Sequence, residues 1–341
     1  MAKTHITIPV FIPHQGCAHR CVFCNQCVTT ATHGPPPPDR IDELVNEYKR
    51  NIKKSVMNVD LAFFGGSFTG MSPEIQKAYL ARAARHLKMG SIQGIRVSTR
   101  PDCISAEAVH NLVSYGVSTI ELGVQSFDGD VLRAAKRGHG PEETFRAIET
   151  IRKLGVDFVI QLMPGLPMET RSSAIRSAQI AADLEPSATR IYPVVVIRNT
   201  LLERLYRNGE FTPLEMEDAI ELCKEMYQIF KSRAIPVIRM GLHPFAPENR
   251  DAIIAGPYHE SFGHLVKSRA RRDEMLRRAG ELLARHDGAA RAIRFLIPHP
   301  HKEEYIGNRK ENIDFIRRHF GLDRVDYAVV DAPRVSVLYA C

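Results

Sequence analysis

The chain has 341 residues, a formal charge of +7 and 44% hydrophobic residues. This length allows one large domain and a small one, and the apolar fraction is ordinary for a globular protein. No apolar run approaches the ~20 residues of a membrane-spanning helix, and Met1–His5 lacks the apolar core of a signal peptide. We therefore expect a cytoplasmic protein with no membrane contact. The positive charge is compatible with a nucleic-acid partner, but solvated surface charge explains it equally well.

Apolar runs of strand length alternate with helical patterns along most of the chain. Six strands are expected at Ile6–Ile12, Val59–Phe64, Gly94–Arg100, Val117–Val124, Val156–Leu162 and Thr189–Ile197. Helices are expected at Asp39–Lys54, Ser72–Lys88, Ser105–Ser114, Asp128–Ala135, Pro141–Leu154, Glu169–Asp183 and Thr212–Ser232. This order predicts an α/β fold with a parallel sheet and helical crossovers, and the nearly continuous apolar strands fit a sheet covered on both faces. A partial barrel and an open doubly wound sheet both satisfy the pattern.

Polar residues and glycines gather at the C-terminal ends of these strands. A cysteine-rich loop follows the first strand, and Gly65-Gly66-Ser67 follows the second. Ser98-Thr99-Arg100, Gln125 and Met163–Pro167 lie at the ends of the next three strands. In parallel βα architectures this edge binds ligands, so the pattern predicts a cofactor site there.

The cysteine-rich loop carries three thiols, at Cys17, Cys21 and Cys24, in the spacing C-x3-C-x2-C. Each thiolate can ligate one iron of a cubane cluster, which leaves the fourth iron open to a substrate or cofactor. The alternative is a structural zinc site with Cys27 or His33 as a fourth ligand. The seven cysteines of the chain do not resemble a disulfide framework.

This spacing, with Phe23 before the third cysteine, resembles the radical S-adenosylmethionine (SAM) superfamily. The resemblance implies a [4Fe–4S] cluster on the three cysteines, with SAM on the open iron and cleaved to a 5'-deoxyadenosyl radical. It also favours a partial (β/α)6 barrel. Five further motifs resemble the radical SAM domain of the Elongator catalytic subunit and, more distantly, oxygen-independent coproporphyrinogen oxidases: Phe63–Thr69, Ser98–Asp102, Ile120–Ser126, Met163–Pro167 and Arg190–Thr200.

The resemblance also assigns roles to individual residues. Phe23 is expected beside the adenine or the cluster, and the carbonyls of Gly65, Gly66 and Ser67 near the methionine ammonium group, where glycine permits close approach. Ser67 stands where many members carry glutamate. The polar side chains expected to contact SAM are Ser98, Arg100, Gln125, Arg137 and Gln161.

Some of these contacts have competing interpretations. Arg100 is a candidate for the SAM carboxylate because guanidinium groups bind carboxylates bidentately, but an ion pair with Asp102 or Glu121 is the alternative. Gln161 replaces an aspartate that is expected to hold the ribose in the coproporphyrinogen oxidase branch. Gln125, Arg137 and Gln161 have structural roles as their alternative.

The resemblance to Elongator weakens after Ser232, and no acetyltransferase motif follows. Arg239–Pro244, Gly256–His259 and a helix at Phe262–Arg285 are expected to close over the barrel mouth. Candidate proton donors or auxiliary ligands in this part are His243, His259 and His264. Ordinary packed or exposed histidines are the alternative.

The last part of the chain, with a β-α-α-β order, resembles a KH-type RNA-binding unit. Ile306–Ile313 aligns with I-G-x-x-G-x-x-I, although Lys310 replaces the second glycine. Gly307, Arg309 and Lys310 are therefore candidate contacts to a nucleic-acid backbone. A packed cap that binds no RNA is the alternative. The expected domains are residues 1–235, 236–290 and 291–341.

Together these features predict a radical SAM enzyme that modifies RNA, with tRNA as the first choice of substrate. A flavodoxin or ferredoxin is the expected electron donor. The alternatives are an enzyme acting on a small molecule or tetrapyrrole, and a non-catalytic iron–sulfur or haem-binding carrier.

Overall fold

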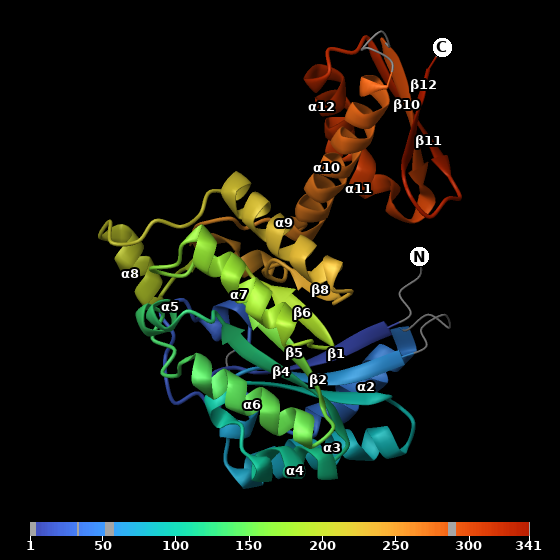
Figure 1. Cartoon of the computed structure of the whole chain (residues 1–341). Helices are drawn as coiled ribbons and strands as arrows, with labels where there is room; N and C mark the ends of the chain where they lie inside the picture. Colours follow the sequence, from blue (N-terminus) through green and yellow to red (C-terminus); the bar gives the residue numbers. More distant parts are fainter. Residues whose placement is uncertain (1–4, 33, 52–57, 286–290, 341) are drawn as a thin grey trace. The chain divides into compact units, whose positions relative to one another are not determined.

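A computed structural model describes residues 5–32, 34–51, 58–285 and 291–340 of the chain (Figure 1). The described residues form two units. The barrel unit contains the residues up to Ala219 together with Ile229–Glu260, and the C-terminal unit contains Ile220–Gln228 together with the residues from Ser261 onward. None of the helices in these ranges is long and apolar enough to cross a membrane.

A sheet of seven parallel strands, curled into a half-barrel, forms the centre of the barrel unit. The strand order is β1-β2-β3-β4-β5-β6-β8, so β1 and β8 are its two edges. The strands are β1 (His5–Ile12), β2 (Asn58–Gly65), β3 (Gly94–Thr99), β4 (Val117–Gln125), β5 (Asp157–Leu162), β6 (Ala188–Ile191) and β8 (Val237–Met240). The partial barrel expected from the sequence is confirmed, with a seventh strand, β8, that the strand pattern did not predict.

The prediction of a single strand at Thr189–Ile197 is wrong. The strand β6 ends at Ile191, and β7 (Val196–Ile197) pairs antiparallel with β9 (Ile253–Ala255) in a separate sheet. The break lies at Pro193, because proline has no N–H group to donate to a ladder. The next residue, Val194, instead donates its N–H to the carbonyl of Pro164, 2.9 Å away, in the loop after β5.

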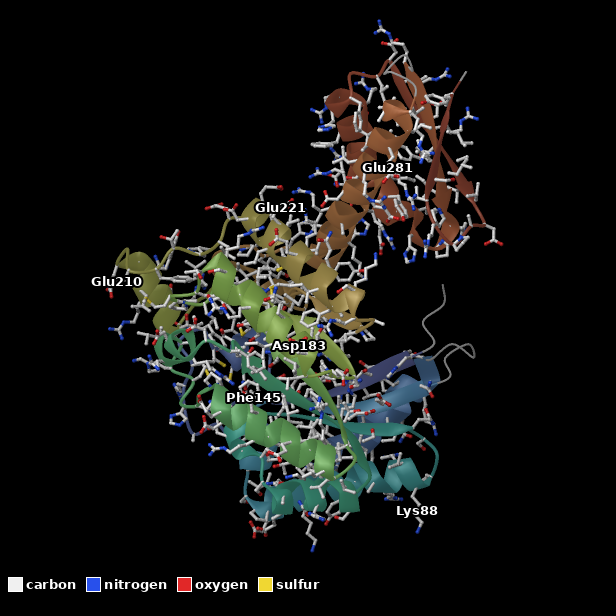
Figure 2. The ribbon with its side chains drawn as sticks, in the orientation of Figure 1. Lys88, Phe145, Asp183, Glu210, Glu221 and Glu281 are labelled. Atoms are coloured by element: carbon white, nitrogen blue, oxygen red, sulfur yellow. The ribbon has the colours of Figure 1, made fainter. Side chains whose placement is uncertain are left out.

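The helices of this unit follow the expected order. Serine at position 72 precedes Pro73, which occupies the first helical position, where its missing N–H costs nothing. Figure 2 shows exposed charged side chains such as Lys88 and Asp183 at helix ends. The helices are α1 (Gln26–Thr30), α2 (Arg40–Asn51), α3 (Pro73–Lys88), α4 (Ala106–Ser114), α5 (Gly129–Ala134), α6 (Pro141–Lys153), α7 (Arg171–Asp183) and α8 (Leu201–Arg207). The next helix, α9 (Met216–Ser232), contains Ile220–Gln228 of the C-terminal unit. The short helices α1 and α8 were not predicted.

The strands present different side chains to their two faces. On β1, Ile8, Val10 and Ile12 are buried in the core, whereas the alternate residue Phe11 lines a cavity. On β4, the cavity-lining residues include the polar Glu121 and Gln125 beside Leu122 and Gly123. Polar side chains thus interrupt β4 where it lines the cavity, which the expectation of nearly continuous apolar strands did not anticipate.

The C-terminal unit has a three-stranded sheet in the order β11-β10-β12. Strand β10 is parallel to β11 and antiparallel to β12, and the third strand, β12, was not predicted. Met275 of α10 packs with Phe295 and Ile316 in the core of this unit. The helix that was expected in a connecting segment therefore shares a core with the C-terminal strands. The elements are α10 (Phe262–Ala284), β10 (Ala292–Pro298), α11 (Lys302–Ile306), α12 (Glu311–His319), β11 (Arg324–Val330) and β12 (Ser336–Tyr339).

Candidate active site

The cysteine-rich loop leaves the end of β1 and is fixed by close backbone contacts to the end of β2. The N–H of Ser67 donates to the carbonyl of Gln15 at 2.8 Å. A Cβ atom on Gly66 would lie 2.0 Å from the Gln15 carbonyl oxygen, and one on Gly16 would lie 2.1 Å from that of Ser67. Because neither approach leaves room for a side chain, the Gly-Gly segment serves first to seat the loop.

Side chains strengthen this seat. Gln26, at the start of α1, donates from Nε2 to the carbonyl of Gly65 at 2.6 Å, and its own N–H donates to His14 Nε2 at 3.1 Å. Burial lowers the pKa of His14, and nearby Arg20 adds to this effect, so a neutral ring can accept that bond. The carbonyl of Gly65 thus already has a partner. Its expected contact with the SAM ammonium group stays a prediction.

The three thiols share the wall of a cavity of about 290 Å³ with Phe23. Burial, together with the neighbouring thiols of Cys21 and Cys17, raises the pKa of Cys24 to about 12. Burial and Cys21 also raise the pKa of Cys17. Such crowded thiols need a positive centre to become thiolates, and metal coordination provides one.

The zinc alternative requires a fourth ligand beside the thiols. Cys27 lies on α1 and is absent from the cavity wall, and His33 lies outside the described residues. Within the part of the chain that the structure describes, no three His, Cys, Asp or Glu side chains are grouped to hold a single metal ion.

Arg137 is the cation in direct contact with a thiol. Its Nη1 donates to Cys21 Sγ at 3.1 Å, and its Nη2 lies 3.2 Å from His139 Nε2. Burial and the charge of Arg137 lower the pKa of His139 to about 4, which keeps this ring neutral near pH 7. The sequence suggested Arg137 as a carboxylate ligand of SAM, but it did not suggest the contact with Cys21 or the presence of His139.

Arg100 forms an ion pair with Asp102, which was one of the two alternatives to a contact with the SAM carboxylate. Its Nε and Nη2 donate to the two carboxylate oxygens of Asp102 at 2.9 and 2.8 Å. Its Nη1 is buried without a hydrogen-bond partner, as is Nε of Arg137. Buried donors are nearly always paired in folded proteins, so these two groups are available to an acceptor. They lie on residues of the same cavity wall as the thiols, so the site fits a cluster together with a carboxylate-bearing cofactor.

Ser67 contributes through structure. Its side chain is fully buried, its Oγ lies 2.8 Å from Thr99 Oγ1, and it accepts the N–H of Arg100 at 3.3 Å. It therefore ties the end of β2 to the end of β3. Ser98, on β3, lines the cavity, and its contact with SAM stays a prediction.

Gln125 and Gln161 also line the cavity and bind each other. Gln161 Nε2 donates to Gln125 Oε1 at 3.0 Å. Gln125 has a φ of 72°, which non-glycine residues rarely adopt, at a register shift between β4 and β5. Such irregularities re-aim side chains next to functional sites. Whether either residue contacts SAM stays a prediction.

A buried ion-pair network crosses the half-barrel. Glu121, only 4% exposed, binds Arg96 and Arg190 at 2.8 Å each. Arg190 also donates to the hydroxyl of Tyr192 at 3.0 Å and lies over the ring of Phe64. The sequence offered Glu121 only as a partner of Arg100, and that pairing is wrong because Arg100 binds Asp102. A charged residue within each of several apolar strands was the signal for this network.

The remaining predicted residues are divided between the units. His243 lines the cavity, whereas His259 and His264 do not. Gly307, Arg309 and Lys310 belong to the C-terminal unit, where all three have positive φ. The φ of 66° at Lys310 is the conformation that the missing glycine of the KH-like pattern would favour.

Comparisons with known proteins agree with this geometry. The family model of the radical SAM superfamily matches residues 11–180, and the model of the radical SAM C-terminal domain matches residues 186–272. A tRNA uridine(34) acetyltransferase from Methanocaldococcus infernus is 29% identical over 184 residues, which covers 48% of this chain and 34% of that protein. Heme chaperone HemW from Bacillus subtilis is 27% identical over 258 residues, which covers 73% of this chain and 63% of that protein.

The fold agrees as well. The structure of Methanocaldococcus infernus Elp3 with an N-terminal deletion matches with a TM-score of 0.63 at 20% identity, over 82% of this chain and 64% of that chain. The chain thus spans less than two thirds of the length of each of these proteins. The two family matches show that the chain belongs to the radical SAM superfamily, whose members use a [4Fe–4S] cluster and SAM.

Proposed function

We propose that the chain is an enzyme that cleaves SAM reductively at a [4Fe–4S] cluster held by Cys17, Cys21 and Cys24. The contact of Arg137 with Cys21, in a cavity with unpaired buried donors, carries this proposal. When bound there, the cluster would supply the electron for the reductive cleavage of SAM.

The protein's own residues bind and orient these groups. Arg137 places positive charge and an N–H donor beside the sulfur of Cys21, which would ligate the cluster. Arg100 Nη1 and Arg137 Nε would donate to the SAM carboxylate, and Gln125 or Gln161 to its ribose. Phe23 would cover the cluster or the adenine from the cavity wall and restrict water there.

RNA, and tRNA in particular, is our proposed substrate. Support comes from the match to a tRNA uridine(34) acetyltransferase and from the basic residues of the KH-like loop. Arg309 and Lys310 follow Gly307, whose φ of 76° and ψ of 171° are nearly exclusive to glycine. In this proposal the loop contacts the RNA backbone and a flavodoxin or ferredoxin supplies the electron.

A second candidate is a haem-binding or tetrapyrrole-binding protein with the same cluster. The match to heme chaperone HemW favours it, because that match covers 73% of this chain compared with 48% for the acetyltransferase. This candidate requires the cavity to bind a tetrapyrrole whether or not SAM is cleaved.

Anaerobic reconstitution distinguishes the two candidates. The purified chain is loaded with iron and sulfide, reduced with dithionite and mixed with SAM, with and without bulk tRNA, and 5'-deoxyadenosine is quantified. Formation of 5'-deoxyadenosine supports the enzyme. Stoichiometric haem binding by a fully loaded protein that forms none, even with tRNA, would favour the carrier.

RNA binding is tested by a gel shift of tRNA at several salt concentrations. The double variant R309Q/K310Q should bind tRNA more weakly and with a shallower salt dependence. With fewer phosphate contacts, binding releases fewer counterions from the RNA. The matched control is R85Q/K88Q, which removes the same charge from exposed residues of the barrel unit. Equal weakening by both pairs would reject a specific role for the loop.

A further inference from the structure

A basic groove adjoins the cluster cavity at the open side of the half-barrel. It includes side chains of both edge strands, β1 and β8. It shares Phe11, Phe64, Arg190 and His243 with the wall of the cluster cavity, so the two spaces are contiguous. Its wall contains no Asp or Glu, and its basic residues are Arg96, Arg190, Arg239, His5 and His243.

Two of the three guanidinium groups in this groove already have carboxylate partners. Arg190 pairs with Glu121 at 2.8 Å through Nε and also uses Nη1 and Nη2 in hydrogen bonds. Arg96 pairs with the other oxygen of Glu121 at 2.8 Å and lies 3.7 Å from Asp60. Both groups are thus already bound to carboxylates of the protein.

Arg239, on β8, differs from both. Its Nε and Nη2 donate to the carbonyls of Gly241 and Leu242 at 3.2 and 2.9 Å, which fixes the plane of the guanidinium group. Among the described residues, no carboxylate lies within ion-pair distance of it, and its Nη1 makes no hydrogen bond to the protein. Burial lowers its pKa, and the neighbouring charge of Arg190 lowers it further. A partly buried charge without a counter-ion is unfavourable, and an anion would relieve this cost.

We infer that Arg239, assisted by His243, binds an oxyanion of the substrate, a phosphate or a carboxylate, while the reacting part of that substrate extends into the cluster cavity. This inference rests on the proposed function and specifies the chemical class of its substrate. The fixed guanidinium group offers Nη1 as a donor of charge-assisted hydrogen bonds. His243 lines the same groove, remains exposed to solvent, and can add a donor from its ring.

The carboxylate of SAM is not the occupant we assign to this position. The unpaired donors that suit it, Arg100 Nη1 and Arg137 Nε, belong to residues that line the cluster cavity and not the groove. Arg239 lines the groove and not the cluster cavity. The chain thus offers separate cationic groups for the cofactor and for the substrate.

The test measures anion binding and SAM cleavage separately on the full, cluster-loaded chain. Inorganic phosphate and acetate are titrated at constant ionic strength with SAM present, and apparent affinities are taken from the thermal unfolding midpoint. The variants are R239M, the charge-preserving R239K, and the control R233M. Arg233 is exposed and pairs with Asp183, and neither residue lines the groove.

We expect phosphate or acetate to stabilise the wild type and R233M alike. R239M should bind that anion at least about tenfold more weakly, as the loss of a charge-assisted hydrogen bond implies, and R239K should recover part of the difference. Stabilisation by phosphate alone would indicate a phosphorylated substrate, and stabilisation by acetate alone a carboxylic acid.

Equal affinity in R239M and the wild type, or no stabilisation of the wild type by either anion, would overturn the inference. Formation of 5'-deoxyadenosine is measured on the same samples and should be unchanged in the control R233M. If the wild type binds the anion but forms no 5'-deoxyadenosine with or without tRNA, the proposed function fails while the anion site stands.

Discussion

Arg137 Nη1 lies 3.1 Å from Cys21 Sγ, although 116 residues separate them in the chain. A positive charge and an N–H group beside a ligating sulfur stabilise the more negative, reduced state of an iron–sulfur cluster. The guanidinium group should therefore tune the ease with which the cluster accepts its electron.

We expect R137M to make the reduction potential more negative by about 60 mV, the one-electron equivalent of a tenfold change in equilibrium. R137K should show a smaller shift because it keeps the charge. A redox titration followed by electron paramagnetic resonance measures both. The control is R133M, which removes an exposed arginine of α5 that pairs with Asp130. An unchanged potential in a fully loaded R137M would contradict this role.

The backbone of Gly66 packs tightly against the backbone of Gln15 in the cysteine-rich loop. Because a Cβ atom there would lie 2.0 Å from the Gln15 carbonyl oxygen, G66A must displace the loop. We expect G66A to lose most of its bound iron. Its free energy of unfolding should fall by about 3 kcal/mol or more, so it should unfold at a lower denaturant concentration.

Iron content and urea unfolding provide the measurements for this variant. G34A is the matched control, since nothing lies within 4 Å of a Cβ at that position. If G66A bound a full complement of iron with the stability of G34A, the backbone contact would not be what seats the loop.

Glu121 is the shared counter-ion of Arg96 and Arg190. Removing its charge in E121Q leaves two buried guanidinium groups together, which should destabilise the protein by about 3–5 kcal/mol. The double variant E121Q/R190Q removes one of these charges and should be more stable than E121Q alone. Urea unfolding of the single and double variants forms a double-mutant cycle. Additive effects would show that the network is not energetically coupled.

Glu169 is the basis for a pH dependence of stability. Burial raises its pKa from 4.5 to about 7, although it accepts the N–H of Gly165 at 2.7 Å. Because the folded state then holds a proton that the unfolded state has released, this group should lower the stability as the pH rises from about 4.5 to about 7.

E169Q cannot ionise and should lack this contribution. The free energy of unfolding is measured for the wild type and E169Q at pH 5 and at pH 7.5. We expect the wild type to lose stability relative to E169Q between these two values. A constant difference between the two proteins would mean that Glu169 titrates near its ordinary pKa.

Local patterns predicted the parallel sheet and its ligand-binding edge, whereas the choice of a partial barrel over an open sheet came from the family resemblance. Apolar runs identify strands such as Val59–Phe64, and the C-terminal ends of parallel strands meet at one edge of the sheet. The cysteine spacing and Gly65-Gly66 likewise lie in continuous segments. These features needed no knowledge of contacts between distant residues.

The features that the sequence did not reveal depend on contacts across the fold. The strand β8 has only four residues and follows a long helix, so no periodic pattern identified it. The pairing of Arg190 with Glu121 joins residues 69 positions apart. Arg137 was assigned by resemblance, but its contact with Cys21 depends on how the segment after α5 returns to the loop, where Val22 donates its N–H to Ala135.

The most direct test of the central claim counts 5'-deoxyadenosine produced per cluster in the wild type and in two cysteine variants. Cys21 lines the cavity and contacts Arg137, whereas Cys27 lies on α1 outside the cavity wall. After anaerobic reconstitution and reduction with dithionite, SAM and tRNA are added and the product is separated by chromatography. We predict product from the wild type and C27A, and neither cluster nor product from C21A. A C21A variant that keeps a full cluster and cleaves SAM, or a C27A variant that loses both, would contradict the account.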